Sequence, residues 1–105
     1  MYYVYLIRCH DNSIYTGITN NIEKRMYAHI HKLKEAAAYT KSREVVSLEL
    51  LFEEKDRSSA SQLEYKIKKL SKNEKEKLIT KELLLEKHKT LEIKDTYFKN
   101  ILEKK

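Results

Sequence analysis

The sequence predicts an α+β domain in which a three-stranded antiparallel sheet is flanked by helices. Two short aromatic and apolar stretches lie near the N-terminus with a turn between them, and a third, alternating stretch follows in mid-chain. Segments with helical periodicity lie between and after these stretches. The length of 105 residues limits the chain to one domain of ordinary size.

The first two strands are expected to form a β-hairpin. Residues 2–9 are rich in β-branched and aromatic side chains on both faces, which is typical of a central strand covered on both sides. Residues 10–13 are a turn signal, and residues 14–18 predict the second strand. Tyr5 and Tyr15 share a sheet face only if the paired residue numbers add to an even sum, and the turn leaves that register open.

The chain contains a single glycine, Gly17, and no proline. A lone glycine indicates a position that needs either a positive φ or the close approach of another group to the backbone. The absence of proline agrees with a chain made mostly of helix, with turns built from Asn, Asp and Ser.

A first helix is predicted over about residues 21–34, opened by a capping box of Asn20 and Glu23. Its apolar positions recur at helical spacing and form one stripe: Ile22, Met26, Ile30 and Leu33. His29 lies within this stripe and Arg25 along its edge, so both lean toward the sheet. Each has an ordinary structural explanation, as a core histidine and as an arginine that extends its charged end into water.

The third strand is predicted over residues 46–52, where apolar and polar side chains alternate. The preceding residues 35–44 lose the helical pattern and contain the basic side chains Lys41 and Arg43.

A second helix is expected after this strand, opened by a capping box of Ser59 and Gln62. Its buried stripe consists of Ala60, Leu63, Ile67 and Leu70. Glu64 lies beside that stripe, and its ordinary explanation is an exposed ion pair with Lys68 one turn later.

Ser71 and Glu74 form a further capping box, which predicts a helix beginning near residue 72. From residue 80 the chain is rich in Lys, Glu and Leu and helical by propensity. We therefore expect a compact body over residues 1–79 and a helical C-terminal extension over residues 80–105, packed on that body or on a partner. The side chains expected to be buried by this packing are Leu83, Leu84, Leu85, Phe98, Ile101 and Leu102.

The charge of the chain is +6, from 22 Lys and Arg against 16 Asp and Glu, and nearly all of the excess follows residue 57. Such a balance suggests contact with a polyanion such as nucleic acid, with a solvated helical surface as the alternative. No stretch is long and apolar enough for a transmembrane helix, and the N-terminus lacks the features of a signal peptide. The lone Cys9 indicates a reducing compartment, so we expect a cytoplasmic protein.

The order of motifs resembles the GIY-YIG nuclease family. Tyr3-Val4-Tyr5 is followed ten residues later by Tyr15-Thr16-Gly17, and then by a helix with Arg25 and His29. The resemblance continues through the strand at 46–52 and the segment around Glu64, and it ends near residue 79. It is strongest to the small stand-alone bacterial members, in which this domain is nearly the whole protein.

The chain departs from the family pattern at a few positions. Tyr3 stands where the family name has Gly, and Thr16 stands where it has Ile. Many members also carry a late asparagine, for which Asn73 and Asn100 are candidates by residue type alone.

The resemblance implies hydrolysis of phosphodiester bonds in DNA with one divalent ion, Mg²⁺ or alternatively Mn²⁺. It implies that Tyr5 is the general base, with Arg25 and the metal favouring its phenolate, and that Arg25 stabilises charge on the phosphate. It further implies that His29 orients a tyrosine or moves a proton, and that Glu64 holds the metal. Tyr15 would hydrogen-bond the water or phosphate, and Gly17 would let the strand approach the substrate.

We therefore predict a metal-dependent DNA endonuclease of DNA repair or processing, with a preference for structure (branched, nicked or single-stranded DNA) rather than sequence. The side chains expected to track phosphates are Lys41, Arg43, Lys66, Lys68, Lys69 and Lys72. One alternative is a non-catalytic nucleic-acid-binding module with the same fold, and another is a structural protein. A monomer is expected, with a dimer through the C-terminal helices as the alternative.

Overall fold

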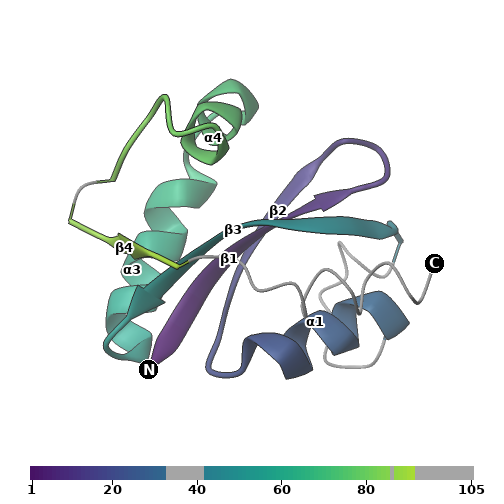
Figure 1. Cartoon of the computed structure of the whole chain (residues 1–105), viewed down its shortest axis with the longest axis horizontal. Helices are drawn as coiled ribbons and strands as arrows, with labels where there is room; N and C mark the ends of the chain where they lie inside the picture. Colours follow the sequence, from purple (N-terminus) through teal and green to yellow (C-terminus); the bar gives the residue numbers. More distant parts are fainter. Residues whose placement is uncertain (33–41, 86, 92–105) are drawn as a thin grey trace.

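The structure is a computed structural model that describes residues 1–32, 42–85 and 87–91. Its strands are β1 (Tyr2–Cys9), β2 (Ile14–Thr19), β3 (Val45–Glu54) and β4 (Lys89–Thr90), and its helices are α1 (Ile22–His31), α3 (Arg57–Lys68) and α4 (Lys72–Ile79). The strands form one antiparallel sheet in the order β2-β1-β3-β4 (Figure 1). Within these ranges no helix is both long and apolar enough to span a membrane.

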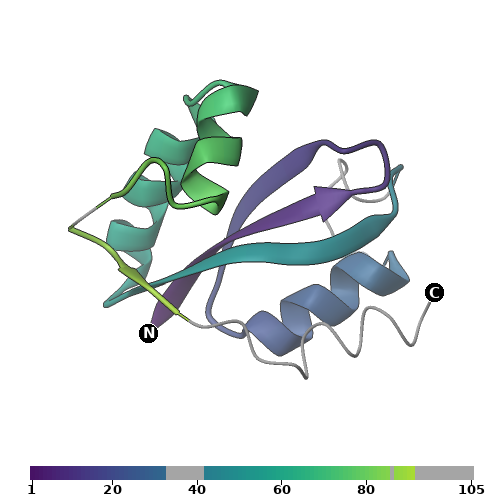
Figure 2. The same ribbon diagram turned by 45° about the horizontal axis from the view of Figure 1, so that its top comes forward.

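The two faces of the sheet are covered by different helices, with α1 on one face and α3 and α4 on the other (Figures 1 and 2). The cluster on the α1 face includes Ile7, Ile22, Met26, Leu48 and Leu51. The cluster on the α3 face includes Val4, Leu6, Phe52, Leu63, Ile67 and Leu78. The predicted α+β fold, an antiparallel sheet flanked by helices, is confirmed, with the short strand β4 as an addition.

A bulge in β3 changes which face its side chains occupy. Leu6 pairs with Leu50 and the next residue, Ile7, pairs with Leu48, so Glu49 is the extra residue. Leu48 consequently packs on the α1 face and Leu50 on the α3 face. The predicted alternation of side chains between the two faces therefore shifts by one residue at Glu49. A strictly alternating pattern in the sequence does not show where such a bulge lies.

Arg8 ties α4 to the sheet. Its terminal nitrogens donate to both carboxylate oxygens of Glu76 at 2.7 and 2.8 Å, and it also donates to Glu49 and to the side chain of Asn12. The hydrogen bonds from Arg8 and Lys72 lower the pKa of Glu76 to about 2. Arg8 was not singled out by the sequence, because its partners lie on three separate segments of the chain.

Two of the three predicted helix starts are wrong. The N-cap of α1 is Asn21 rather than Asn20, and the N-cap of α3 is Asp56 rather than Ser59. In both cases another good capping residue lies nearby, and the packing of the helix selects between them. The predicted capping box at Ser71–Glu74 is confirmed at the start of α4.

Residues 80–91, outside position 86, form turns and β4 instead of the predicted helix. Leu83 and Leu85 pack against the cluster on the α3 face, whereas Leu84 is exposed. The N–H of Leu91 donates to the carbonyl of Leu51 at 2.8 Å, which continues the pairing with β3. Burial and pairing at the sheet edge thus outweigh helix propensity here. The expectations for Phe98, Ile101 and Leu102 lie outside the described residues.

Thr16 is a polar side chain among the apolar residues on the α3 face of the sheet. It lies on β2 between Ile14 and Ile18, which pack in or against the cluster on the α3 face. Its side chain is buried, and its Oγ1 has no hydrogen-bond partner among the described residues. Burial of an unpaired hydroxyl costs free energy, so this position opposes folding.

We expect Thr16→Val to raise the free energy of unfolding by about 1 kcal/mol, because it removes the unpaired hydroxyl and keeps the side-chain shape. The control is Thr19→Val, because the Thr19 hydroxyl is bonded to the backbone of Asn21 at 3.1 and 3.2 Å and its loss should destabilise. Urea unfolding followed by circular dichroism measures both. Destabilisation of similar size in the two variants would contradict the prediction.

Candidate active site

The register of the hairpin places the two motif tyrosines on the same face of the sheet. Tyr5 pairs with Gly17 and Ile7 pairs with Tyr15, and every pair in this register has an even sum. Side chains of directly paired residues, and of residues two apart, share a face. Tyr5, Tyr15 and Gly17 therefore all face α1, which settles the question that the turn sequence left open.

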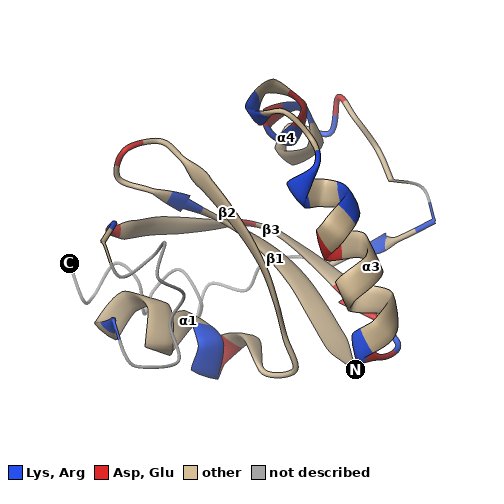
Figure 3. Cartoon of the chain, turned by 180° about the vertical axis from the view of Figure 1, so that it is seen from behind, with Lys and Arg blue, Asp and Glu red and all other residues tan. Residues whose placement is uncertain are grey.

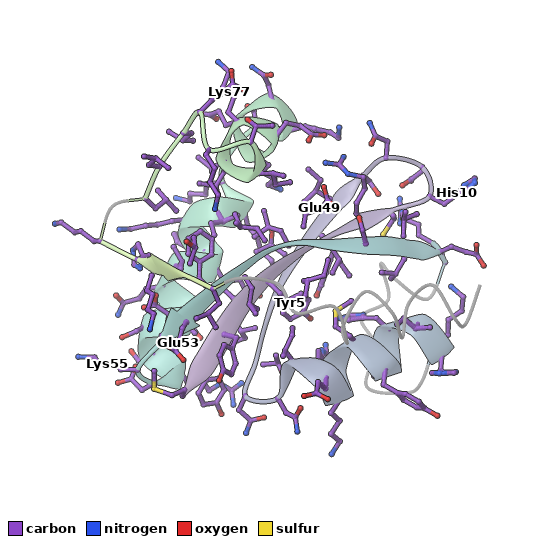
Figure 4. The ribbon with its side chains drawn as sticks, viewed as in Figure 1. Tyr5, His10, Glu49, Glu53, Lys55 and Lys77 are labelled. Carbon is purple, nitrogen blue, oxygen red and sulfur yellow. The ribbon has the colours of Figure 1, made fainter. Side chains whose placement is uncertain are left out.

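The Tyr5 hydroxyl is held by two side chains of α1. Figure 4 shows Tyr5 between the sheet and this helix. The Nε–H of Arg25 donates to the hydroxyl oxygen at 3.1 Å, and Nε2 of His29 lies 2.8 Å from the same oxygen. Arg25 and His29 are four residues apart and so lie on one side of the helix. The predicted inward lean of both side chains is confirmed.

The protonation of this group follows from its burial. Burial, and secondly the charge of Arg25, lower the pKa of His29 to about 4, so its ring is neutral at neutral pH. The Tyr5 oxygen accepts from Arg25, and either partner of the 2.8 Å contact with Nε2 of His29 can donate: the Tyr5 hydroxyl donates to the tautomer protonated at Nδ1, whereas the tautomer protonated at Nε2 donates to Tyr5.

Burial also raises the pKa of Tyr5 to about 12, against the opposing effect of Arg25. Arg25 favours the phenolate, as expected, but without a bound metal its effect is too small and Tyr5 is a neutral phenol. The physical reason is that desolvation of the buried ring outweighs one cationic neighbour.

Tyr15 completes a group of three rings. Its ring centroid lies 6.4 Å from that of Tyr5 and 5.8 Å from that of His29. The rings of Tyr5 and His29 are 5.6 Å apart in an edge-on arrangement. This packing restrains the His29 ring in the position from which it meets the Tyr5 hydroxyl.

Gly17 makes room for the Tyr5 ring. A Cβ at this position would meet the Tyr5 hydroxyl oxygen, would lie 2.6 Å from Tyr5 Cζ, and would lie 3.1 Å from Cε2 of Tyr15. Its φ is not positive, so conformational freedom is not the reason for glycine here. Of the two explanations that the sequence allowed, close approach is correct, and the approaching group is the side chain opposite it on β1.

Glu64 reaches this group from α3, which lies on the other face of the sheet. Its carboxylate forms an ion pair with Lys68 at 3.3 Å, and Lys68 Nζ lies 5.8 Å from the ring centroid of Tyr15. The negative charge of Glu64 is one of the effects that raise the pKa of Tyr5. Glu64 therefore acts on Tyr5 through its charge and is linked to Tyr15 through Lys68, and its ordinary ion pair with Lys68 is present.

The donor set around Glu64 fits an open magnesium site. Among the described residues no group of three or more His, Cys, Asp or Glu side chains could hold a metal ion. Mg²⁺ in nucleic-acid enzymes commonly binds one or two carboxylates and completes its shell with water and phosphate oxygens. The Glu64 side chain is 21 % exposed, so a hydrated ion can reach it, and a single carboxylate implies weak binding without substrate.

The side chains expected to contact phosphates differ in their surroundings. Lys41 lies outside the described residues, and Arg43 donates to Asp11 in the β1–β2 turn at 2.9 Å. Lys72 is paired with Glu76, whereas Lys66 is exposed.

Lysines nevertheless gather where α3 ends and α4 begins (Figure 3). Lys69 lies there with Nζ 4.4 Å from the ring centroid of Tyr65. Lys75 of α4 belongs to this cluster, since burial and the charge of Lys68 lower its pKa. Lys75 was not among the side chains predicted to contact phosphates, although its four-residue spacing from Ser71 at the N-cap places it on the first turns of α4.

Comparisons with known proteins show which proteins this chain is similar to. A family model described as the GIY-YIG catalytic domain matches residues 1–77. A UPF0213 protein of Fusobacterium nucleatum is 45% identical over 80 residues, which cover 76% of this chain and 78% of that protein. A UPF0213 protein of Clostridium perfringens is 41% identical over 93 residues, which cover 89% of this chain and 98% of that protein. The solution NMR structure of a UPF0213 protein from Bacillus halodurans is 31% identical, with a TM-score of 0.45 over 76% of this chain and 84% of that one.

We expect Gly17→Ala to lower the free energy of unfolding by about 1–3 kcal/mol, because the new methyl group overlaps the Tyr5 ring. The control is the same substitution in a Tyr5→Leu background, where the overlapping ring atoms are absent and the added cost should be much smaller. Chemical denaturation of the four proteins gives this coupling. An equal cost in both backgrounds would show that the ring is not the obstacle.

His29 should make stability depend on pH. Its folded-state pKa of about 4 lies below the ordinary value of 6.5, so the unfolded chain binds more protons between these values. Stability should therefore fall as the pH drops from 6.5 toward 4, by up to about 3 kcal/mol from this group. In His29→Gln this part of the loss should disappear, whereas the exposed-site control His10→Gln should keep it. Parallel pH profiles of wild type and His29→Gln would contradict the assignment.

Proposed function

Because this chain belongs to the GIY-YIG catalytic domain family, we propose that it is a metal-dependent endonuclease that hydrolyses phosphodiester bonds in DNA. The observation that carries the proposal is the Tyr5 hydroxyl held between Arg25 and His29. Burying a phenol that is hydrogen-bonded to a cation and to a neutral imidazole costs more folding free energy than packing with apolar side chains, which is typical of a functional site.

Arg25 is the group proposed to bind the scissile phosphate. Its planar guanidinium matches phosphate oxygens, and it stays charged under all ordinary conditions. It also lines an open cavity at the start of α1, from which a phosphate could reach it. The positive charge would stabilise the additional negative charge that develops on the phosphate oxygens during attack.

Tyr5 and His29 are proposed to move the proton of the attacking water. The water would give a proton to the Tyr5 oxygen while the Tyr5 hydroxyl proton passes to Nε2 of His29, so the phenol itself need not ionise first. Arg25 is one cause of the low His29 pKa, and a phosphate anion bound to Arg25 offsets that charge. Substrate binding would thereby make His29 a better proton acceptor. Tyr15, at the same face, would orient the water or the phosphate.

Glu64 is the residue proposed to hold Mg²⁺, with Mn²⁺ as the alternative ion. The bound ion supplies electrostatic stabilisation of the phosphate and of the departing oxygen. Lys68 neutralises Glu64 within the protein, so this ion pair has to loosen for the carboxylate to bind a metal.

The proposed substrate is DNA recognised by its backbone and its structure rather than by its sequence, as in repair or processing of branched, nicked or single-stranded DNA. The residues proposed to contact phosphates are Lys41, Arg43, Lys66, Lys68, Lys69 and Lys72, to which the structure adds Lys75. A cytoplasmic location, which the lone Cys9 supports, and a monomeric state belong to the same proposal.

A non-catalytic nucleic-acid-binding module is the second candidate. The observation that favours it is the Lys68–Glu64 ion pair, because the proposed metal ligand already has a cationic partner. The two candidates differ in whether Glu64 is needed for bond cleavage or only for folding.

We expect the purified protein with Mg²⁺ to cut plasmid, single-stranded or branched DNA, and EDTA to abolish the cutting. Arg25→Ala and Glu64→Ala should each lower the cleavage rate by about 100-fold or more, since each removes a charge at the reacting phosphate. Tyr5→Phe should lower it similarly while keeping the ring in place. Glu82→Gln is the control carboxylate, since Glu82 is exposed and accepts from the Thr80 hydroxyl.

Two outcomes decide between the candidates. Cleavage that persists unchanged in both Arg25→Ala and Glu64→Ala would exclude the proposed site. DNA binding by the wild type without cleavage of any of the three substrates would favour the non-catalytic module.

A further inference from the structure

An exposed aromatic pair lies on α1 outside the proposed chemistry. The Tyr27 side chain is 52 % exposed, and its ring centroid lies 4.0 Å from that of His31, with 36° between the ring planes. Tyr27 and His31 are four residues apart, so they are neighbours along the helix surface. Nothing in the hydrolysis proposed for Tyr5 and Arg25 uses them.

Tyr27 borders a cavity that also borders the proposed active site. The cavity has a volume of about 410 Å³ and lies where β2 passes into α1. Asn20, Lys24, Arg25 and Tyr27 are among the residues that line it. Arg25 belongs both to the cavity and to the proposed active site, because its Nε–H also donates to the Tyr5 hydroxyl. A ligand in this cavity would therefore lie next to the scissile phosphate that Arg25 is proposed to bind.

We propose that this cavity receives one unpaired nucleotide next to the scissile phosphate, with its base stacked on Tyr27 and its phosphate bound by Lys24. The inference rests on the proposed function and names the substrate class of that same site. The volume is sufficient for a base with part of its sugar. The charged side chains that line the cavity are Lys24 and Arg25, and their sign suits a nucleotide.

The aromatic face is what selects an unpaired base. Within a duplex both faces of each base are covered by its neighbours, so a side chain cannot stack on it without opening the helix. An unstacked base at a nick, flap or single strand has a free face, and stacking on an aromatic ring contributes about 1–3 kcal/mol. His31 packs against the Tyr27 ring, which restrains the ring before a base arrives.

Tyr65 offers a matched comparison on another helix. It is 62 % exposed on α3, and Lys69 Nζ lies 4.4 Å from its ring centroid. One face of each ring is therefore covered, by Lys69 on Tyr65 and by His31 on Tyr27, so this feature is common to both. Tyr65 is not among the residues that line the cavity beside Arg25. Exposure alone therefore does not distinguish the two tyrosines, but their surroundings do.

The test is equilibrium binding in EDTA, where no cleavage occurs, of a fluorescent single-stranded oligothymidine and of a blunt duplex of the same length. Tyr27→Ala should weaken binding of the single strand about tenfold and of the duplex less than about twofold. Tyr27→Phe, which keeps the stacking face, and Tyr65→Ala should each stay within about twofold of wild type. Lys24→Ala should weaken both ligands, since phosphates are common to them. Thermal unfolding checks that each variant is folded.

Several results would overturn the inference: no single-strand binding by the wild type, no effect of Tyr27→Ala, an equal loss on both ligands, or a loss in Tyr27→Phe as large as in Tyr27→Ala. Its failure is distinguishable from failure of the proposed function. Cleavage by a wild type whose Tyr27 variants bind normally would remove the stacking role and leave the nuclease. Tyr27-dependent binding of single strands without cleavage would leave the stacking role and remove the nuclease.

Discussion

The pairing of Tyr5 with Gly17 across the first two strands is the constraint on which the candidate site depends. It places a large ring directly opposite the one residue without a side chain, so the ring can lie close over β2. The hydroxyl then meets Arg25 and His29 of α1. A shift of one residue in this register would turn Tyr5 to the other face of the sheet and separate its hydroxyl from Arg25 and His29. The single glycine of the chain is thus needed to make room for a side chain and not to form a turn.

Burial between the sheet and α1 determines the chemical state of this group. Tyr5 and His29 lose water and are kept neutral, whereas Arg25 remains charged and stays near the surface. Two neutral groups joined by a hydrogen bond of 2.8 Å are suited to relaying a proton, and a cation beside them is suited to holding the anion being attacked. The same burial makes the arrangement costly for stability, which is typical of functional sites.

The two helical layers contribute different parts to the proposed function. The α1 side carries the tyrosines' partners and the cavity beside Arg25, whereas α3 carries Glu64, and the end of α3 and the start of α4 carry the lysine cluster. The two sides are linked at the edge strand β2, where Lys68 Nζ lies 5.8 Å from the ring centroid of Tyr15. Arg8 connects α4 to the centre of the sheet and so holds the lysine-rich junction of α3 and α4 in place.

Local patterns in the sequence determined the order of strands and helices up to residue 79, the capping box at Ser71–Glu74 and the inward lean of Arg25 and His29, because these depend on neighbours a few residues away. The motif order was also sufficient to identify the family. Only the tertiary structure decided the even register, the bulge at Glu49 and the pairing of β4, since each depends on contacts between distant segments. The protonation of Tyr5 belongs with these, because burial is a property of the folded protein and here it outweighs the charge of Arg25.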